Sequence, residues 1–166
     1  MEDTLKKINT LVFDIDGVLT DGKFYVDELG HFRKGFLDKD FGALRELKKH
    51  FRIVLISASQ KVNEHVGKML GVFFYYEPHD KKKKLKELMN KWNINSNNVL
   101  FVGDSYVDIK CTQLIPLSFC PYDAIPELLN SPNVITLDAY GGEGVAVEIY
   151  EMLKPEIMRR RKYGKD

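Results

Sequence analysis

Short apolar runs that alternate with stretches of helical spacing constrain the fold of this chain more than any other feature. The runs are rich in Val, Ile, Leu and Phe without regular alternation, which is typical of strands covered on both faces. Strands are predicted at residues 10–14, 53–57, 72–76, 99–102, 117–120 and 134–136, and helices at 41–50, 62–70, 81–92, 106–112 and 144–153. This order predicts an α/β fold with a doubly wound, Rossmann-like parallel sheet, right-handed crossovers and helices on both faces.

One segment interrupts this order after the first strand. Residues 24–26 and 32–36 are two short extended runs around a turn that contains Gly30, so a β-hairpin is predicted there. No repeat, low-complexity linker or proline-rich boundary divides the chain, and residues 1–166 are therefore expected to form a single domain.

The C-terminal end has its own signals. The last helix is expected to end at Leu153, before Pro155, because proline cannot continue the hydrogen-bond ladder of a helix. The basic tail from Arg159 is expected to be a solvated, frayed end. A tail that reaches the site of a neighbouring chain is the alternative.

Charge and composition exclude several classes of partner. The 25 basic and 24 acidic residues leave a net charge of +1, which does not favour nucleic acid or an anionic membrane. Two isolated cysteines, Cys111 and Cys120, are too few for a disulfide framework and fit a reducing compartment. No apolar run has the length of a targeting or membrane-spanning segment, so a soluble cytoplasmic protein is expected.

Chemically reactive side chains follow the ends of the apolar runs. Because the carboxyl ends of parallel strands meet at one edge of a sheet, these side chains are expected to converge. Several carboxylates at one point require a cation, and oxygen ligands favour magnesium over zinc. A lysine and a hydroxyl at the same point provide a place for phosphate oxygens. The residues concerned are Asp14, Asp16, Ser57, Lys81, Asp104 and Asp108.

Each of these residues alone also has a structural interpretation. Asp16, Asp108 or Ser57 could serve as a helix cap or turn residue. Their order at consecutive strand ends favours the functional interpretation, because caps and turns do not require such an order.

Four segments resemble, in order and spacing, the four motifs of the haloacid dehalogenase superfamily of phosphotransferases. They are "DIDGVLTDG", the serine that ends "VLIS", the lysine at position 81, and "VGDSYVD". The hairpin, "DKD", "FGALREL", "HDKKKKLKEL" and "GGEGVAVEIYEML" are similar to the capless subfamily of phosphatases that act on 3-deoxy-D-manno-octulosonate 8-phosphate and on sialic-acid-type 9-phosphates. The resemblance covers nearly the whole chain and leaves no room for a cap domain.

The resemblance implies a role for each acidic residue. Asp14 is the expected nucleophile, because a carboxylate can attack phosphorus and form an aspartyl-phosphate. Asp16 is the expected general acid and base. Mg²⁺ is expected to be held by the Asp14 side chain, the Asp16 carbonyl oxygen and Asp104, with Asp108 in support.

The phosphoryl group is expected to bind near the same turn. The resemblance implies that Ser57 and Lys81 fix and neutralise it, with Ala58 beside them in the second motif. Backbone amides around Gly17 would cradle the transferring oxygens, since glycine permits the close turn that this requires.

Substrate and assembly follow less directly. The resemblance implies an eight- or nine-carbon sugar acid phosphate as substrate and a homotetramer in which a neighbouring chain covers the site. In the second motif, Ala58 and Ser59 replace the glycine and charged residue of many relatives, which leaves the sugar open. The alternatives are a phosphatase of other small phosphometabolites and a non-catalytic oligomerisation module of the kind found beside cytidylyltransferase domains. Exposed hairpin aromatics would favour a contact between chains, and those expected are Phe24, Tyr25, Phe32 and Phe36.

Overall fold

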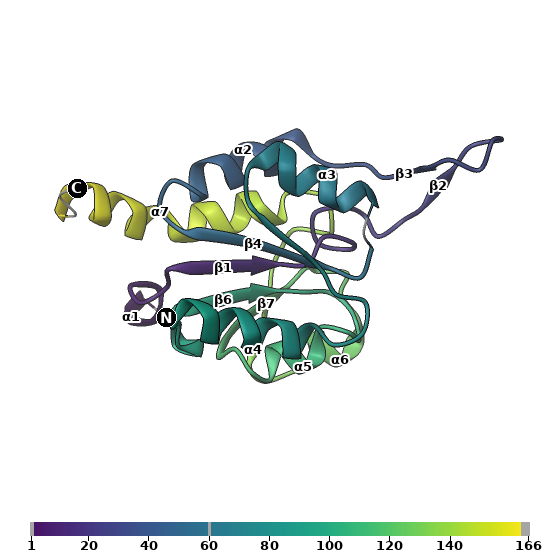
Figure 1. Ribbon diagram of the computed structural model, residues 1–166. Coiled ribbons are helices and arrows are strands. Elements are labelled where there is room, and N and C mark those ends of the chain that lie inside the picture. The colour runs from purple at the N-terminus through teal and green to yellow at the C-terminus, as the bar shows by residue number, and fades with distance from the viewer. Residues whose placement is uncertain (1, 60, 164–166) are drawn as a thin grey trace.

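The computed structural model describes residues 2–59 and 61–163 and contains one six-stranded parallel sheet with helices on both faces (Figure 1). The sheet strands are β1 (Thr10–Phe13), β4 (Arg52–Ser57), β5 (Phe73–Tyr76), β6 (Val99–Val102), β7 (Leu117–Cys120) and β8 (Val134–Thr136). The helices are α1 (Glu2–Leu5), α2 (Asp38–Leu47), α3 (Lys61–Leu70), α4 (Lys81–Trp92), α5 (Ile109–Thr112), α6 (Pro126–Leu129) and α7 (Val145–Tyr163), with a 3₁₀ turn at Ser96–Asn98. The predicted doubly wound fold is confirmed.

The strand order places a switch point at the centre of the sheet. The order is β5-β4-β1-β6-β7-β8, so the chain leaves β1 toward one edge and leaves β6 toward the other. Ligands bind at such points, outside the carboxyl ends of the strands, because the two connections diverge and leave a crevice. Asp14 directly follows β1, and Asp104 follows β6 after one glycine.

Two apolar layers hold the sheet. Leu11 and Phe13 of β1 point into a core that includes α2, α3 and α7, whereas Val12 points into a second core with α4 and α5. Figure 1 shows these two groups of helices on opposite faces of the strands. Alternate residues of one strand therefore enter different cores, which explains why the strand sequence is apolar throughout.

Some helix boundaries differ from the prediction. Helix α2 begins at Asp38, three residues before the predicted start, because its first turn carries charged residues that hide the apolar periodicity. Helix α5 begins at Ile109, and the preceding residues from Ser105 form a turn. Strands β6, β7 and β8 have the predicted bounds.

The prediction that the last helix ends before Pro155 is wrong. Helix α7 continues to Tyr163 with Pro155 inside it. Ile157 beyond the proline is 2% exposed in the main core, and Arg160 donates hydrogen bonds to the carbonyl oxygens of Ile8 and His50. These contacts offset the lost backbone bond, so residues 159–163 are helical rather than a frayed end, and residues 164–166 lie outside the described chain.

The predicted hairpin projects from the body of the protein (Figure 1). Strands β2 (Tyr25–Val26) and β3 (Phe32–Arg33) pair antiparallel and form a separate two-stranded sheet. Phe24 and Phe32 are exposed as predicted, whereas Phe36 packs against the core beside Phe41 and is not a hairpin surface residue. No described helix is long and apolar enough to cross a membrane.

Candidate active site

The turn after β1 buries the Asp14 carboxylate at the centre of the sheet edge. The Asp14 backbone NH continues the ladder to β6 by donating to the Val102 carbonyl oxygen at 2.9 Å. The side chain of Asp14 accepts a hydrogen bond from the Ile15 NH at 2.7 Å. Burial, and then the nearby Asp108 carboxylate, raises the pKa of Asp14 well above its usual range although Lys81 opposes the shift. Contacts within the protein therefore fix the position of the Asp14 carboxylate, which is largely shielded from solvent.

Lys81 is the positive charge of this buried cluster. It begins helix α4, whose N-cap Asp80 accepts a hydrogen bond from the Lys83 NH. The Lys81 ammonium lies 2.6 Å from an Asp14 oxygen and 2.9 Å from an Asp108 oxygen. Burial by itself would lower the pKa of Lys81, but the two carboxylates outweigh burial and raise it. Lys81 stays charged and bridges Asp14, which follows β1, and Asp108, which precedes α5.

Asp108 organises the loop that follows β6. Its second oxygen accepts hydrogen bonds from the backbone NH groups of Asp104 and Ser105 and from the Ser105 hydroxyl, at 3.1–3.2 Å. Gly103 permits this approach, because a Cβ there would lie 2.6 Å from Asp108 side-chain atoms. Asp108 thus positions Lys81 and the Asp104 backbone together, and its predicted support of a metal stays a prediction.

Asp104 carries an unpaired oxygen next to Asp14. Its Oδ1 atom is buried and has no hydrogen-bond partner among the described residues. Burial, together with Asp108, raises the pKa of Asp104 to about 7 against the opposing charge of Lys81. A buried carboxylate without a partner is costly, so this oxygen indicates a group that the protein itself does not supply.

These carboxylates fit a hard divalent cation. Asp14, Asp104 and Asp108 each offer an oxygen, and the three atoms lie within 4.8 Å of one another. Gly17 leaves the space beside them open, since a Cβ at this position would lie 2.0 Å from an Asp104 oxygen. Gly17 also has φ of +85°, a conformation that glycine adopts without strain. The cluster has oxygen ligands only, as Mg²⁺ prefers.

Asp16 faces the opposite, more open side of the turn. Its side chain is 27% exposed, and one oxygen forms an ion pair with Lys34 at 2.5 Å. The other oxygen accepts hydrogen bonds from the Asn63 amide at 2.9 Å and from the Ser57 hydroxyl at 3.3 Å. The structure therefore brings Asp16 and Ser57 together as predicted. The contacts join the turn after β1, the end of β4 and the start of α3.

The remaining predicted residues take different positions. Ser57 ends β4, and its hydroxyl oxygen accepts hydrogen bonds from the Ser59 NH at 2.9 Å and the Asn63 amide at 2.8 Å. Ala58 is exposed directly after the strand, and no described contact joins it to the buried cluster. The prediction that Ala58 binds phosphate therefore rests on its place in the motif.

Sequence reasoning missed two residues that contact Asp16. Asn63 is fully buried in the first turn of α3, and Lys34 follows the hairpin strand β3. A polar residue six positions after Ser57, at the start of an amphipathic helix, is a weak signal for Asn63. Nothing in the sequence around Lys34 distinguishes it from the neighbouring Arg33, which pairs with Asp27 at the surface.

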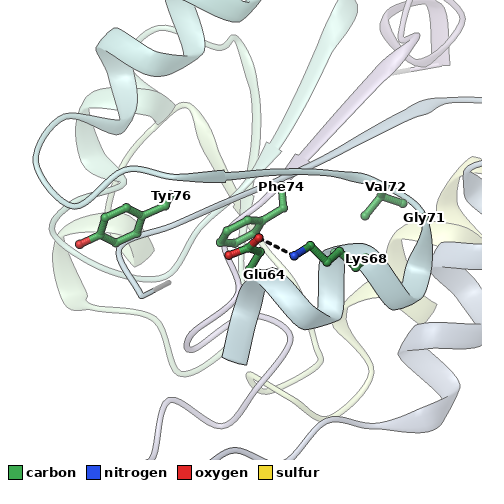
Figure 2. A pocket seen from close by; sticks show the side chains of 7 residues that line it. Glu64, Lys68, Gly71, Val72, Phe74 and Tyr76 are labelled. Atoms are coloured by element: carbon green, nitrogen blue, oxygen red, sulfur yellow. Dashed lines mark ion pairs between the residues drawn. The ribbon is translucent and has the colours of Figure 1, made fainter. Parts of the chain in front are cut away.

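A hollow elsewhere on the protein takes no part in this site. Figure 2 shows it between α3 and β5, where Glu64 and Lys68 form an ion pair at 2.7 Å. Its lining contains none of the predicted site residues. Helix and strand approach closely there because Gly67 has no Cβ; a Cβ at this position would lie 2.6 Å from Phe74. We assign no chemistry to this hollow.

A buried carboxylate beside a lysine, at a switch point of a parallel sheet, places an acid and a positive charge where a phosphorylated ligand can bind. Comparisons with known proteins agree. The family described as haloacid dehalogenase-like hydrolases matches residues 34–149, a span that begins after Asp14 and Asp16. A 3-deoxy-D-manno-octulosonate 8-phosphate phosphatase of Salmonella typhi is 30% identical over 151 residues, which cover 89% of this chain and 80% of that protein.

Solved structures agree in fold. The 3-deoxy-D-manno-octulosonate 8-phosphate phosphatase of Yersinia pestis has a TM-score of 0.83 at 25% identity and covers 91% of this chain, with 83% of its own chain covered. The phosphatase of Moraxella catarrhalis was solved in complex with magnesium, phosphate and the sugar acid. It has a TM-score of 0.85 at 22% identity, and the match covers 92% of this chain and 89% of that chain. This chain belongs to the haloacid dehalogenase-like hydrolases. The predicted hydrolase of the phosphatase class is confirmed.

Proposed function

We propose that this protein is a Mg²⁺-dependent phosphomonoesterase that acts through an aspartyl-phosphate on Asp14. The observation that carries the proposal is the buried Asp14 carboxylate, paired with Lys81 and next to the unpaired Asp104 oxygen. The core fixes this carboxylate at the switch point of the sheet, where a phosphoryl group can approach it from the crevice. A positioned carboxylate of this kind can attack phosphorus.

The first step joins Asp14 to phosphorus. One Asp14 oxygen forms a bond to the phosphorus atom as the bond to the leaving oxygen breaks. Asp16, which takes up a proton as the substrate binds, donates that proton to the leaving oxygen. Lys81 neutralises charge on the transferred group as a fixed ammonium. Ser57, held by Asn63, offers a hydroxyl to the same group.

The second step releases phosphate. Water attacks the phosphorus atom, Asp16 accepts the proton of that water, and the bond to Asp14 breaks. Asp16 suits both steps because its side chain is 27% exposed, whereas the Asp14 side chain is only 5% exposed. The products are inorganic phosphate and an alcohol, and Asp14 is again a carboxylate while Asp16 again carries the proton that it had in the substrate complex.

Magnesium is the proposed cofactor. The Asp14 and Asp104 side chains, with the Asp16 carbonyl oxygen, would hold it, and Asp108 would keep Lys81 and the Asp104 loop in place. When bound, the ion supplies positive charge for the phosphate oxygens and for the crowded carboxylates. The magnesium in the Moraxella phosphatase supports this choice.

The proposed substrate is a phosphorylated eight- or nine-carbon sugar acid. The Salmonella relative, named for 3-deoxy-D-manno-octulosonate 8-phosphate, supports this class. The second motif supports no single sugar, because Ala58 and Ser59 carry no charge. A phosphatase of other small phosphometabolites would use the same catalytic residues with a different cavity.

Phosphate release is the direct test. We expect Mg²⁺-dependent release from 3-deoxy-D-manno-octulosonate 8-phosphate or a sialic-acid-type 9-phosphate, and none from the Asp14→Asn variant. The ratio of kcat/KM for the two substrates identifies the sugar. Hydrolysis of p-nitrophenyl phosphate alone would retain the mechanism and reject the substrate class. No hydrolysis of any ester would favour the non-catalytic oligomerisation module.

We also propose that the single domain of residues 1–166 works in the cytoplasm as a homotetramer. The hairpin supports this assembly, because Leu29 is 80% exposed and Phe24 and Phe32 are 60% and 62% exposed. Apolar side chains that exposed are typical of contact surfaces. Light scattering should give a tetramer mass for the wild type and a smaller mass for Phe32→Ser, and a monomeric wild type would contradict the assembly.

A further inference from the structure

Lys34 joins the active site to a cavity that the catalytic steps leave without a role. The cavity has a volume of about 770 Å³ and lies between the hairpin and the start of α3, lined by Phe24, Gly30, His31, Phe32, Lys34, Ser59 and Val62. That volume is in the range of cavities that bind small molecules. Neither Asp14 nor Lys81 is among the described residues that line it, and Lys34 is the lining residue that contacts Asp16.

The Lys34 side chain is built into this cavity and is not a surface lysine. It is 3% exposed, and its ammonium lies 3.2 Å from the Ser59 hydroxyl and 3.3 Å from the Asn63 amide oxygen, in addition to its ion pair with Asp16. The ring of Phe24 lies 5.0 Å from the same ammonium. An ammonium enclosed in this way has lost most of its water and gains strongly from an anionic partner.

Asp16 supplies that anionic partner in the free protein. A substrate whose phosphoryl group sits at Asp14 must place its leaving oxygen near Asp16 and the rest of its alcohol in the adjoining space. The described cavity is lined by Lys34, whose ammonium forms an ion pair with Asp16, and is therefore the candidate for that space. A negative group on that alcohol would meet Lys34, whereas a neutral alcohol would leave Lys34 with Asp16 alone.

From this geometry we propose that Lys34 determines specificity by binding a carboxylate on the leaving alcohol, which replaces part of its contact with Asp16. The proposal rests on the proposed phosphomonoesterase function and identifies the feature of the substrate that the cavity selects. It assigns the selection to one side chain of the same chain. The apolar ring of Phe24 and the Ser59 hydroxyl complete the contact surface for a polyhydroxy acid.

Two ligands of equal length test this selection. 6-Phosphogluconate and sorbitol 6-phosphate are open six-carbon chains that differ by one carboxylate. Their competition constants are measured against hydrolysis of p-nitrophenyl phosphate, so the test does not require that either ligand be the natural substrate. The wild type should bind 6-phosphogluconate more tightly, and Lys34→Met should reduce that preference about 10- to 100-fold. Because loss of the Lys34 contact with Asp16 affects the binding of both ligands, the ratio of their competition constants reports only the contribution of the carboxylate.

Matched variants complete the test. Lys34→Arg should keep most of the preference, and Arg33→Met, which removes an exposed charge one residue away, should keep all of it. An unchanged ratio in Lys34→Met, or a wild type that does not distinguish the ligands, would overturn the proposal. Failure of the proposed function is separate, because it would show as no hydrolysis of p-nitrophenyl phosphate at all.

Discussion

The two acids on either side of Ile15 occupy contrasting surroundings. The Asp14 side chain is 5% exposed and pairs with Lys81 of helix α4, whereas the Asp16 side chain is 27% exposed and pairs with Lys34, which follows the projecting hairpin. The sheet and its cores therefore fix the buried side, and surface elements form the open side. The buried side fits the phosphoryl-transfer steps, which are the same for many phosphate esters. The open side fits the selection of one leaving alcohol over another.

Asp14→Asn should have the largest effect on activity and little harmful effect on folding. We expect kcat to fall about 10³-fold or more, because the amide cannot form the phosphoryl bond. The free energy of unfolding without Mg²⁺ should stay the same or rise, because a buried charge is removed. Steady-state kinetics and urea unfolding measure the two effects. A variant that unfolds more readily would show that the buried side depends on the Asp14 charge.

Lys81→Met should damage both activity and stability. It leaves the buried acids Asp14 and Asp108 without their shared cation, and the free energy of unfolding should fall by about 3–5 kcal/mol. Lys82→Met is a control at the next position of the same helix, outside the ion pairs of the cluster. Equal losses of activity and stability in both variants would show that the ion pairs of Lys81 with Asp14 and Asp108 are not the cause.

Acidity should distinguish the protein with and without Mg²⁺. The folded protein raises the pKa of Asp104 from 3.8 to about 7, so between these values it binds a proton that the unfolded chain has released. The contribution of Asp104 to the free energy of unfolding in EDTA should therefore be highest near pH 4 and fall by roughly 1–4 kcal/mol as the pH rises to 7. Bound Mg²⁺ favours the ionised acid and should reduce this fall. Identical urea curves with and without Mg²⁺ at pH 8 would contradict the metal site.

Gly17→Ala should separate crowding at the site from backbone strain. Both Gly17 and Gly30 have positive φ, at +85° and +77°, but only the Cβ at Gly17 would meet Asp104. Each alanine should cost about 1–2 kcal/mol of stability through strain. Activity and Mg²⁺ affinity should fall in Gly17→Ala alone. A similar loss in Gly30→Ala would show that strain suffices.

Asn63→Ala should have the smallest effect and acts on the open side. Its amide donates to both Asp16 and Ser57, so we expect kcat/KM to fall about 10-fold as these side chains lose their fixed positions. A loss of kcat/KM of this size would support the difference between the open and the buried side. A loss as large as that of Asp14→Asn would contradict that difference.

Much of the buried side could be predicted from the sequence. Strands buried on both faces give continuous apolar runs, and acids at their ends, such as Asp14 and Asp104, mark the switch point without any knowledge of side-chain contacts. Lys81 could be predicted through the motif and the helix that begins there.

The open side could not be predicted in this way. Lys34 reaches Asp16 across 18 residues from an exposed segment with no periodicity, and Asn63 reaches it from a helix whose apolar face dominates the pattern. The continuation of α7 past Pro155 also depends on distant contacts, made by Arg160 with Ile8 and His50. Local sequence carries no signal for such long-range hydrogen bonds.

The Asp16→Asn variant tests whether a covalent intermediate forms on Asp14. p-Nitrophenyl phosphate needs no proton on its leaving group, so this variant should still form the aspartyl-phosphate and then fail to activate water. We expect a burst of one nitrophenolate per chain and, after borohydride reduction, homoserine at position 14 by peptide mass spectrometry. Turnover by the wild type with no burst in the variant, and Asp14 unmodified, would contradict it.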